Sequence, residues 1–574
     1  MKAASIASHR FGFSEPRLAA VQSDPRGWVL DQFRHPAKLD SAGLMDSVSA
    51  LQMTREVLKG ALKEQAADAD KKPQDELGAM TPSRLELRKA NIQCLRRRWQ
   101  HVVSTPTPVA ERWVQFWANH FCVAATKGTM IALVWPHENE AIRPNAFGSF
   151  KALARAAVLH PAMLLYLDNA QSIGPDSPGG QRRSRGLNEN LARELLELHT
   201  LGVRGGYSQD DVTQTAKLLT GWTVNAQTQG KAAFVNALHQ PGAKQVLGKR
   251  YAQGSQAIDE LLGDLVRHPS CADYVATKLV RHFVADDPPP ELVRVVATRF
   301  RDTDGDLLAL AGALFGHDLA WRTDSVAKLK RPEEYLLSAH RMLQIPSLAM
   351  EHLVPAVQGM GQSIGRAPSP QGWPDRAEDW LSPDALLKRV HWAEGFAQRH
   401  GAGYDARALA RAAFGEDLSS GTARQIERAD SASQAIALLL ASPEFQRRSR
   451  HAQHAYAARD FALVGSGRRH RRGAASAPGL GRNSGQCAGA APTTGGGYVA
   501  WRARWLGCGA GAGRSGMVRA SPRGRPGSYQ CAGIATRRHV RAAPVLGAIA
   551  PMVRAARAAG GARRGQPVPG AIAL

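Results

Sequence analysis

The segment GLNENLARELLELHTLG, residues 186–202, places a carboxylate on a side of the predicted helix that is otherwise apolar. At about 100° per residue, the leucines at 187, 191, 195, 198 and 201 share one face, with Glu194 inside it and Asn190 and Glu197 at its edge. A buried carboxylate is unfavourable unless it is paired or protonated. We therefore predict a buried polar centre at Glu194, where replacing a paired carboxylate by Gln would cost roughly 3–5 kcal/mol.

Other side chains are candidates to share this centre. His120 lies in the aromatic stripe of ERWVQFWANHF, where a core histidine satisfied by the backbone is the alternative. Arg143 of HENEAIRP can pair bidentately with Glu194. Asp168 ends the apolar helix of HPAMLLYLDN, where a helix-end cap is the alternative. The catalytic candidates are His120, Glu194 and Asp168, and the binding candidates are Arg143, Asn190 and Glu197.

No familiar metal or nucleotide motif accompanies these residues. HENEAIRP misses the H-E-x-x-H zinc pattern because position 141 is Ala, and neither G-x-S-x-G nor a P-loop occurs. DTDGD at 302–306 lacks the later Glu of a calcium loop and is better explained as a turn before a helix. The sequence therefore leaves both the metal and the cofactor unknown.

The elements that must hold these residues are mainly α-helices. Amphipathic helical stretches begin at Ser47, Ser83, Pro108, Ser149 and Ser208. Ser208 and Asp211 form an acidic variant of the capping box, and Gly202 suits the end of the preceding helix. The best strand pattern is a hairpin around HQPGAKQVLG, residues 239–248. We predict a mainly α fold, a multi-helix globular body with at most a small β-hairpin, followed by a disordered C-terminal tail.

Two segments are predicted to be flexible from their composition. They are KEQAADADKKPQDE at 63–76 and SIGPDSPGGQRRSRG at 172–186. The second segment leads directly into the Glu194 helix. It can therefore cover a site or simply connect two helices, and we favour the connector.

Charge is distributed unevenly along the chain. The net charge is +25, but residues 461–574 contribute 18 Arg and no Lys, Asp or Glu, which leaves +7 for residues 1–460. This mixed surface predicts no specific nucleic-acid binding. The cysteines at 94, 122 and 271 are expected to be reduced or buried, since no C-x-x-C occurs. The absence of a signal-like apolar stretch and of an 18-residue apolar run predicts a soluble chain with no transmembrane segment and no signal peptide of its own.

The C-terminal part differs in character from the rest. From Phe461 onward, Gly, Ala and Arg make up 66 of 114 residues, and no helical or alternating period can be followed. We predict a helical domain at 1–450 and a disordered Arg/Gly/Ala-rich tail at 451–574. The lack of any R-G-G disfavours an RNA-binding tail. Out-of-frame GC-rich codons yield Ala, Gly, Arg and Pro, so the composition favours a frame-shift product.

Several motifs occur in a recognisable order: HRFGF, FWANHF, ENEAIRP, HPAMLLYLDN, RGLNENLARELLELHTLGVRGGYSQDDV, LTGWT, KLKRPEEYLLSAHRML, GWPDRAEDWLSP and LLASPEFQRR. Over about residues 8–448 the chain resembles the bacterial domain of unknown function 1800 family. The resemblance implies a large helical bacterial protein, without an established activity. It also implies a partner, a sulfatase-like exported protein encoded nearby. Localisation is then cytoplasmic, or periplasmic by co-export with that partner.

Two functions remain open. The first is a binding or assembly partner of a cell-envelope protein, which fits the helical architecture and the implied neighbour. The alternative is an enzyme with a buried His/carboxylate centre, acid/base or metal-dependent. Convergence of three or more candidate side chains would favour the enzyme, whereas dispersal into caps and ion pairs would favour the binding protein.

Overall fold

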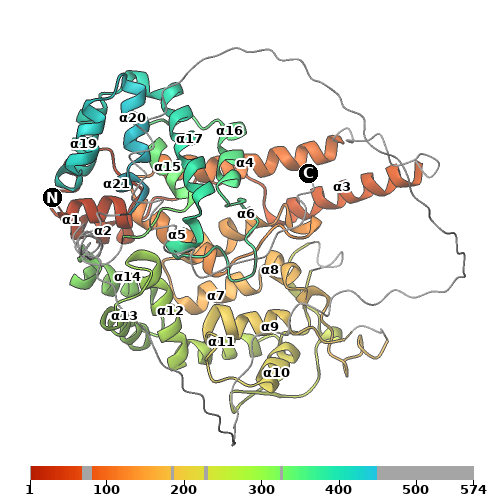
Figure 1. Cartoon of the computed structure of the whole chain (residues 1–574). Helices are drawn as coiled ribbons and strands as arrows, with labels where there is room; N and C mark the ends of the chain where they lie inside the picture. The colour runs from red at the N-terminus through yellow and green to blue at the C-terminus, as the bar shows by residue number, and fades with distance from the viewer. Residues whose placement is uncertain (1, 68–80, 183–185, 225–229, 324–326, 449–574) are drawn as a thin grey trace, which may run out of the picture. The chain divides into compact units, whose positions relative to one another are not determined.

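Figure 1 shows the chain as a computed structural model, which describes residues 2–67, 81–182, 186–224, 230–323 and 327–448. The fold is mainly α, as predicted from the helical periodicity. Within the described residues, sheets are limited to two small antiparallel hairpins. The predicted tail at 451–574 and most of the predicted flexible segment at 63–76 lie outside the described residues.

One group of helices packs around the larger of the two main cores, in which Trp113 and Trp117 are fully buried. The group consists of α2 (Pro25–Arg34), α5 (Pro108–His120), α7 (Phe150–Val158), α8 (Pro161–Tyr166), α9 (Asn190–Glu194), α10 (Gln209–Leu219), α11 (Ala257–Arg267), α12 (Pro269–Phe283), α13 (Pro290–Asp302) and α14 (Leu307–Gly316). Because α5 carries His120 at its last turn, this core also determines where His120 lies.

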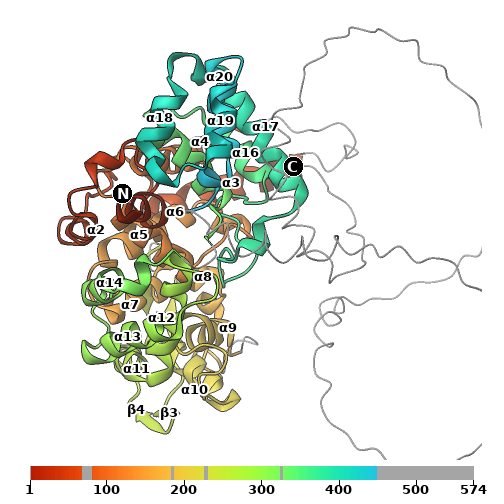
Figure 2. The same cartoon turned by 60° about the vertical axis from the view of Figure 1, so that its left-hand side comes forward.

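A second core is built mainly from the C-terminal helices. It contains α4 (Pro82–Ser104), α15 (Pro332–Met342), α16 (Met350–Gly359), α17 (Pro383–His400), α18 (Ala406–Phe414), α19 (Ser420–Glu427), α20 (Ala432–Ala441) and α21 (Pro443–Gln446). Figure 2 shows the α16–α20 group on one side of α5 and the α11–α14 group on the other. The remaining α-helices are α1 (Lys2–Ser5), α3 (Ser47–Ala67) and α6 (Val134–Pro136).

The helix ends follow the predicted capping chemistry. Ser208 accepts from the backbone of Asp211, whose carboxylate accepts in return, so the predicted capping box begins α10. Asp306 caps α14, which confirms the turn interpretation of DTDGD. Gly202 follows the Glu194 helix with a φ of +80°, a left-handed conformation that suits glycine.

Three π-helical turns interrupt the α-helical pattern: η1 (Ile6–Phe11), η4 (His137–Ile142) and η7 (Leu195–Thr200). Each places a histidine in the interior, and His9, His137 and His199 are at most 2% exposed. π-Turns are rare in proteins, but those that occur are frequently found at functional sites. The η7 turn continues α9 directly and carries Glu197, so it controls the surroundings of Glu194.

The predicted hairpin is formed by β3 (Lys244–Val246) and β4 (Lys249–Tyr251). Its turn residues, Leu247 and Gly248, both have positive φ, as a type I′ turn requires. A second hairpin, β1 (Trp222–Thr223) with β2 (Ala233–Phe234), was not predicted, because two-residue strands leave no readable alternation.

The described part of the predicted loop at 172–186 is attached to the segment that precedes the β3–β4 hairpin. Gly174 and Gly179 donate backbone hydrogen bonds to Leu238 and Ala237, at 2.9 and 2.7 Å. Ser177 is fully buried, and its hydroxyl donates to the Gly174 carbonyl at 2.6 Å. These bonds fix the position from which the chain enters α9.

Candidate acid–base centre

Glu194 lies at the end of α9, where the chain passes into the η7 turn. Its side chain is half-buried, and so is that of Glu197 one turn later. Among the described residues, neither carboxylate forms a hydrogen bond or an ion pair. The two acids therefore influence each other without an ion pair of their own, although the nearby charge of Arg193 favours the ionised form of Glu194 and opposes the raised pKa of this group.

The leucine pattern predicts part of the buried face of this segment. Leu191, Leu195 and Leu201 are buried as predicted, and so are Ala192, Leu196 and His199. Leu187, which precedes α9, and Leu198 are only half-buried. The wider π-turn contributes to this broader buried face, because it rotates the residues that follow Glu194 relative to an α-helical wheel.

Two histidines lie beneath this turn. His120 Nε2 is 2.9 Å from the backbone carbonyl of His199, and the two rings are 6.2 Å apart between centroids. His120 is 1% exposed and His199 is fully buried. His120 Nδ1 and both ring nitrogens of His199 have no hydrogen-bond partner among the described residues. Buried polar atoms are almost always bonded, so these three nitrogens require explanation.

Helix α12 supplies the other side of the centre through Tyr274 and Lys278. The Tyr274 hydroxyl donates to the Leu198 carbonyl at 2.9 Å, and its ring lies 6.3 Å from that of His120. Lys278 Nζ is 5.5 Å from the centre of the Tyr274 ring. Among the described residues, half-buried Lys278 makes no hydrogen bond and no ion pair.

In this centre the pKa values of one acid and one amine are both shifted toward neutral pH. Burial, with a further contribution from Glu197, raises the pKa of Glu194 to about 7. Burial lowers the pKa of Lys278 to about 8, although Asp375 opposes the shift. Burial also raises the pKa of the Cys122 thiol to about 12, so this cysteine is no ready nucleophile. Proton transfer near neutral pH is the chemistry that this arrangement allows.

The histidines are held neutral. Burial, with a further contribution from Lys278, lowers the pKa of His199 to about 3. The pKa of His120 is also well below its usual range, first because of burial and then because of Lys278 and His199. Neutral imidazoles at this place can donate and accept hydrogen bonds but do not neutralise Glu194.

Asp168 and Asn190 form their contacts with residues other than Glu194. Asp168 has a φ of +59° and pairs with Lys127 at 2.5 Å, with both side chains substantially exposed. Asn190 is exposed, and its backbone N–H donates to the Asn188 side chain at 2.9 Å. Neither makes a hydrogen bond or an ion pair to Glu194 among the described residues.

Arg143 does not pair with Glu194, and this expectation was wrong. Its guanidinium binds both oxygens of Glu111, at 2.7 and 2.8 Å, and one oxygen of Glu138, at 2.6 Å. Arg98 continues this buried network by binding Glu138 at 2.9 Å. The carboxylates closest to Arg143 come from α5 and η4, so both terminal nitrogens of its guanidinium are paired away from Glu194.

The described residues contain no group of three or more His, Cys, Asp or Glu side chains arranged to hold a metal ion. One histidine–carboxylate pair illustrates a structural role instead. His160 caps α8 through Nδ1 and contacts Glu140 through Nε2 at 3.0 Å. The three described cysteines at 94, 122 and 271 are free and buried, as expected.

Lys278, Tyr274 and His199 were not singled out in the sequence, although a signal existed. On a helical wheel of α12, Lys278 falls between Cys271 and Tyr274, on the face that is otherwise apolar. The argument applied to Glu194 would therefore have identified Lys278. His199 could not be assigned in this way, because its orientation depends on a π-turn.

Fold and site together define a helical protein in which Glu194 and Lys278 are unpaired among the described residues and His120 and His199 are buried close to each other. The sequence model of one family, described as a protein of unknown function (DUF1800), matches residues 6–447. The chain belongs to this family. Neither the curated proteins nor the solved structures contain a match to it. No helix among the described residues is both long and apolar enough to cross a membrane.

Proposed function

We propose that the chain is an enzyme that transfers protons through Glu194 and Lys278, although Arg143, Asp168 and Asn190 form their contacts elsewhere and do not join this centre. The observation that carries this proposal is that two half-buried groups near Tyr274 are unpaired among the described residues. Lys278 Nζ is 5.5 Å from the centre of the Tyr274 ring. The pKa of Tyr274 is raised first by burial and then by the charges of Glu197 and Glu194. The buried carboxylates elsewhere, such as Glu111 and Glu334, face arginines directly. Unpaired charge destabilises a fold, and active sites are where it is commonly retained.

The two pKa values indicate which group accepts a proton and which group donates one. Between pH 7 and 8, Glu194 is largely deprotonated and Lys278 largely protonated, since their pKa values are about 7 and about 8. Glu194 then accepts a proton from the reacting molecule, and Lys278 donates one. The rate should follow a bell-shaped pH profile with limbs near these two values. His120, Tyr274 and His199 support the centre from its buried side.

An activity screen of the full chain tests the proposal. The substrates are esters, amides, phosphate esters, sulfate esters and glycosides, and the variants are Glu194→Gln and Lys278→Met. Matched controls are Glu291→Gln and Lys231→Met, which change exposed residues. We expect a loss of roughly 100-fold or more in the site variants only. Competitive acylation should also show Lys278 titrating near 8.

Two results would overturn the proposal. One is activity that both site variants retain at the level of the controls. The other is no turnover in any substrate class, combined with a Lys278 that titrates in the same range as exposed Lys231. Metal analysis of the purified chain distinguishes the metal-dependent form of the enzyme, because stoichiometric metal lost in Glu194→Gln would place a metal at this centre.

The second candidate is an assembly partner of a cell-envelope protein, such as a sulfatase-like exported protein. It is supported by the exposed face of α4, which carries Arg84, Arg88, Lys89 and Arg96 at helical spacing. Glu86, the one acid on this helix, already binds Lys89 at 2.9 Å. The end of α4 near residue 82 lies away from the two helix groups in Figure 1. Such a face suits an acidic protein surface.

A binding assay with the purified sulfatase-like protein tests this second function. Arg88→Glu with Arg96→Glu should weaken binding and make the remaining binding less sensitive to salt, whereas Arg428→Glu, at an exposed position just after α19, should change neither. Fractionation gives the localisation: co-export would place the chain in the periplasm only when the partner is present. If the double α4 variant binds as tightly as the natural chain, the basic face of α4 is not the binding surface.

A further inference from the structure

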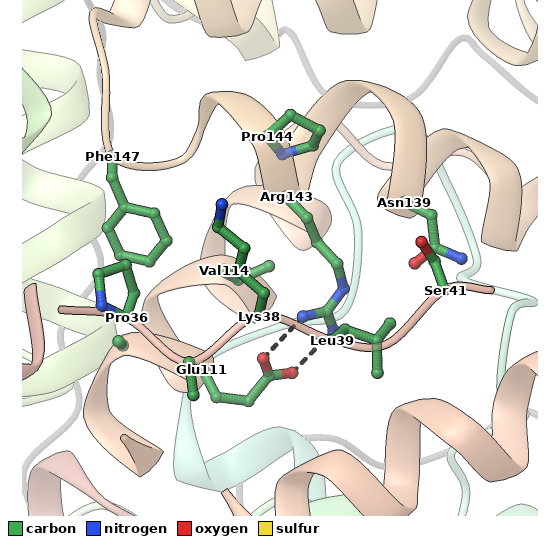
Figure 3. A pocket seen from close by; sticks show the side chains of 12 residues that line it. Pro36, Lys38, Leu39, Ser41, Glu111, Val114, Asn139, Arg143, Pro144 and Phe147 are labelled. Atoms are coloured by element: carbon green, nitrogen blue, oxygen red, sulfur yellow. Dashed lines mark hydrogen bonds and ion pairs between the residues drawn. The ribbon is translucent and has the colours of Figure 1, made fainter. Parts of the chain in front are cut away.

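A pocket of about 380 Å³ opens between the segment 36–41, helix α5 and the η4 turn (Figure 3). This volume lies within the range of small-molecule sites. The apolar part of its lining consists of Pro36, Ala37, Leu39, Ala110, Val114, Pro144 and Phe147. The polar part consists of Lys38, Ser41, Glu111, Asn139 and Arg143. The pocket thus combines apolar walls with a few polar groups, as ligand sites do.

The floor of the pocket is the Glu111–Arg143 ion pair. Both carboxylate oxygens of Glu111 accept from Arg143, at 2.7 and 2.8 Å, and the side chain of Glu111 is 2% exposed. Although burial opposes it, Arg143 lowers the pKa of Glu111, so both groups stay charged near neutral pH. The acid in the lining is therefore neutralised by its own neighbour and offers little to a ligand.

Lys38 is the charged side chain of the pocket that has no partner among the described residues. Its side chain is exposed and makes no hydrogen bond or ion pair among the described residues. In Figure 3 its ammonium extends across the opening, between Phe147 and Arg143. The charged lining residues Lys38, Arg143 and Glu111 sum to one positive unit, and because Arg143 is paired with both Glu111 and Glu138, the charge open to a ligand is that of Lys38. The Nε of Arg143 is an additional buried donor without a partner among the described residues.

We propose that this pocket binds a small organic monocarboxylate. Its carboxylate meets the Lys38 ammonium, and its apolar part packs against Val114, Phe147 and the prolines. A net charge of +1 matches one carboxylate, and the apolar walls favour a hydrocarbon body over a bare anion such as phosphate. This site is separate from the acid–base centre: Glu111 and His120 are nine residues apart on α5, about 14 Å along the helix axis.

The probes are monocarboxylates from acetate to octanoate together with benzoate, each compared with its neutral amide. Binding to the full chain is followed by calorimetry or by ligand-observed NMR. We expect affinity to rise with the hydrocarbon part, and a carboxylate to bind about fivefold tighter than its amide. Lys38→Met should remove that preference, while Lys231→Met, a matched control on another exposed lysine, should preserve it.

A second variant tests, independently of charge, whether the ligand binds in this pocket. Ser41→Trp fills the opening from an exposed position and should reduce binding of carboxylates and amides alike, with the thermal transition unchanged. The proposal fails if no carboxylate binds better than its amide, if Lys38→Met keeps the preference, or if inorganic phosphate binds as tightly as octanoate. Because Glu194 is intact in every variant, these outcomes are independent of the proposed enzyme activity.

Discussion

Arg448 binds Glu334 across 114 residues of sequence and completes a buried Arg–Glu–Arg triad. Its Nε lies 2.9 and 3.0 Å from the two carboxylate oxygens, and its Nη2 lies 2.6 Å from Oε2. Arg112 approaches the same carboxylate at 2.8 Å. Both guanidiniums are at most 2% exposed. The last described residue of the chain is therefore part of the core.

A chain that stops after residue 450 is expected to keep the unfolding temperature of the full chain, because it retains both cores and the triad. A chain that stops after Gln446 lacks Arg448 and leaves Glu334 with one arginine. It should be less stable by roughly 3–5 kcal/mol. Circular dichroism during heating measures both. Loss of a cooperative transition in the 1–450 chain would show that the helical domain depends on the tail.

The triad should also have a defined pH dependence. Burial raises the pKa of Glu334, but Arg112 and Arg448 overcome this and hold it far below the ordinary value of 4.5. A depressed folded-state pKa adds stability that is complete above about 4.5 and is lost as pH falls toward the folded value. The stability difference between the natural chain and Arg448→Met should therefore be constant from pH 8 to 5 and shrink below 4.5.

Urea unfolding at a series of pH values measures this difference. Arg428→Met, at an exposed position, is the control and should change stability by less than about 0.5 kcal/mol throughout. A difference that grows toward acid pH would mean that Glu334 is protonated in the folded protein and that the triad is not ionic.

Gly202 should be needed both for its backbone and for the position of Tyr274. Its φ is +80°, and an added Cβ would lie 2.7 Å from Cδ2 of the Tyr274 ring. Gly206 has a φ of +81°, but a Cβ there would meet nothing within 4 Å. Gly206→Ala should therefore cost about 1 kcal/mol from the backbone alone, and Gly202→Ala clearly more. Urea unfolding of the two variants provides the comparison, and equal losses would contradict the Tyr274 contact.

The helices could be predicted because their determinants are local. The Ser208 capping box, the aromatic stripe on α5 and the glycine after the Glu194 helix all act within a few residues. The other residues of the acid–base centre could not be predicted, because Tyr274 and Lys278 lie about 80 residues further along the chain. Arg143 shows the same limit: a guanidinium can be predicted to need a carboxylate, but several carboxylates compete, and Glu111 and Glu138 are the ones that face it.

The leucine pattern predicted only part of the buried face of α9 and η7: Leu191, Leu195 and Leu201 are buried as predicted, but so are Leu196 and His199. A π-turn shifts the angular positions of the residues after it, and the sequence carries no signal for that shift. What the pattern did locate was an acid in a partly apolar environment. Its half-burial and its raised pKa follow from that environment.

Glu194→Gln is expected to stabilise the protein at alkaline pH, the reverse of what a paired carboxylate would do. The ordinary pKa of a glutamate is 4.5, and burial together with Glu197 raises that of Glu194 to about 7. The folded state therefore binds more protons than the unfolded state between these values. Stability contributed by this residue falls as pH rises through the window, and the full penalty remains above pH 7.

Glutamine keeps the shape of Glu194 without the charge, so it removes this penalty. Glu194→Gln should raise the free energy of unfolding by roughly 1–3 kcal/mol at pH 8 and leave it nearly unchanged at pH 4. Glu291→Gln, on an exposed residue, should have little effect at either pH. Urea unfolding at the two pH values tests this. A loss of 3–5 kcal/mol at pH 8 would instead reveal an ionised, paired Glu194. Stabilisation combined with lost activity would mark Glu194 as a residue whose charge serves the reaction at the expense of the fold.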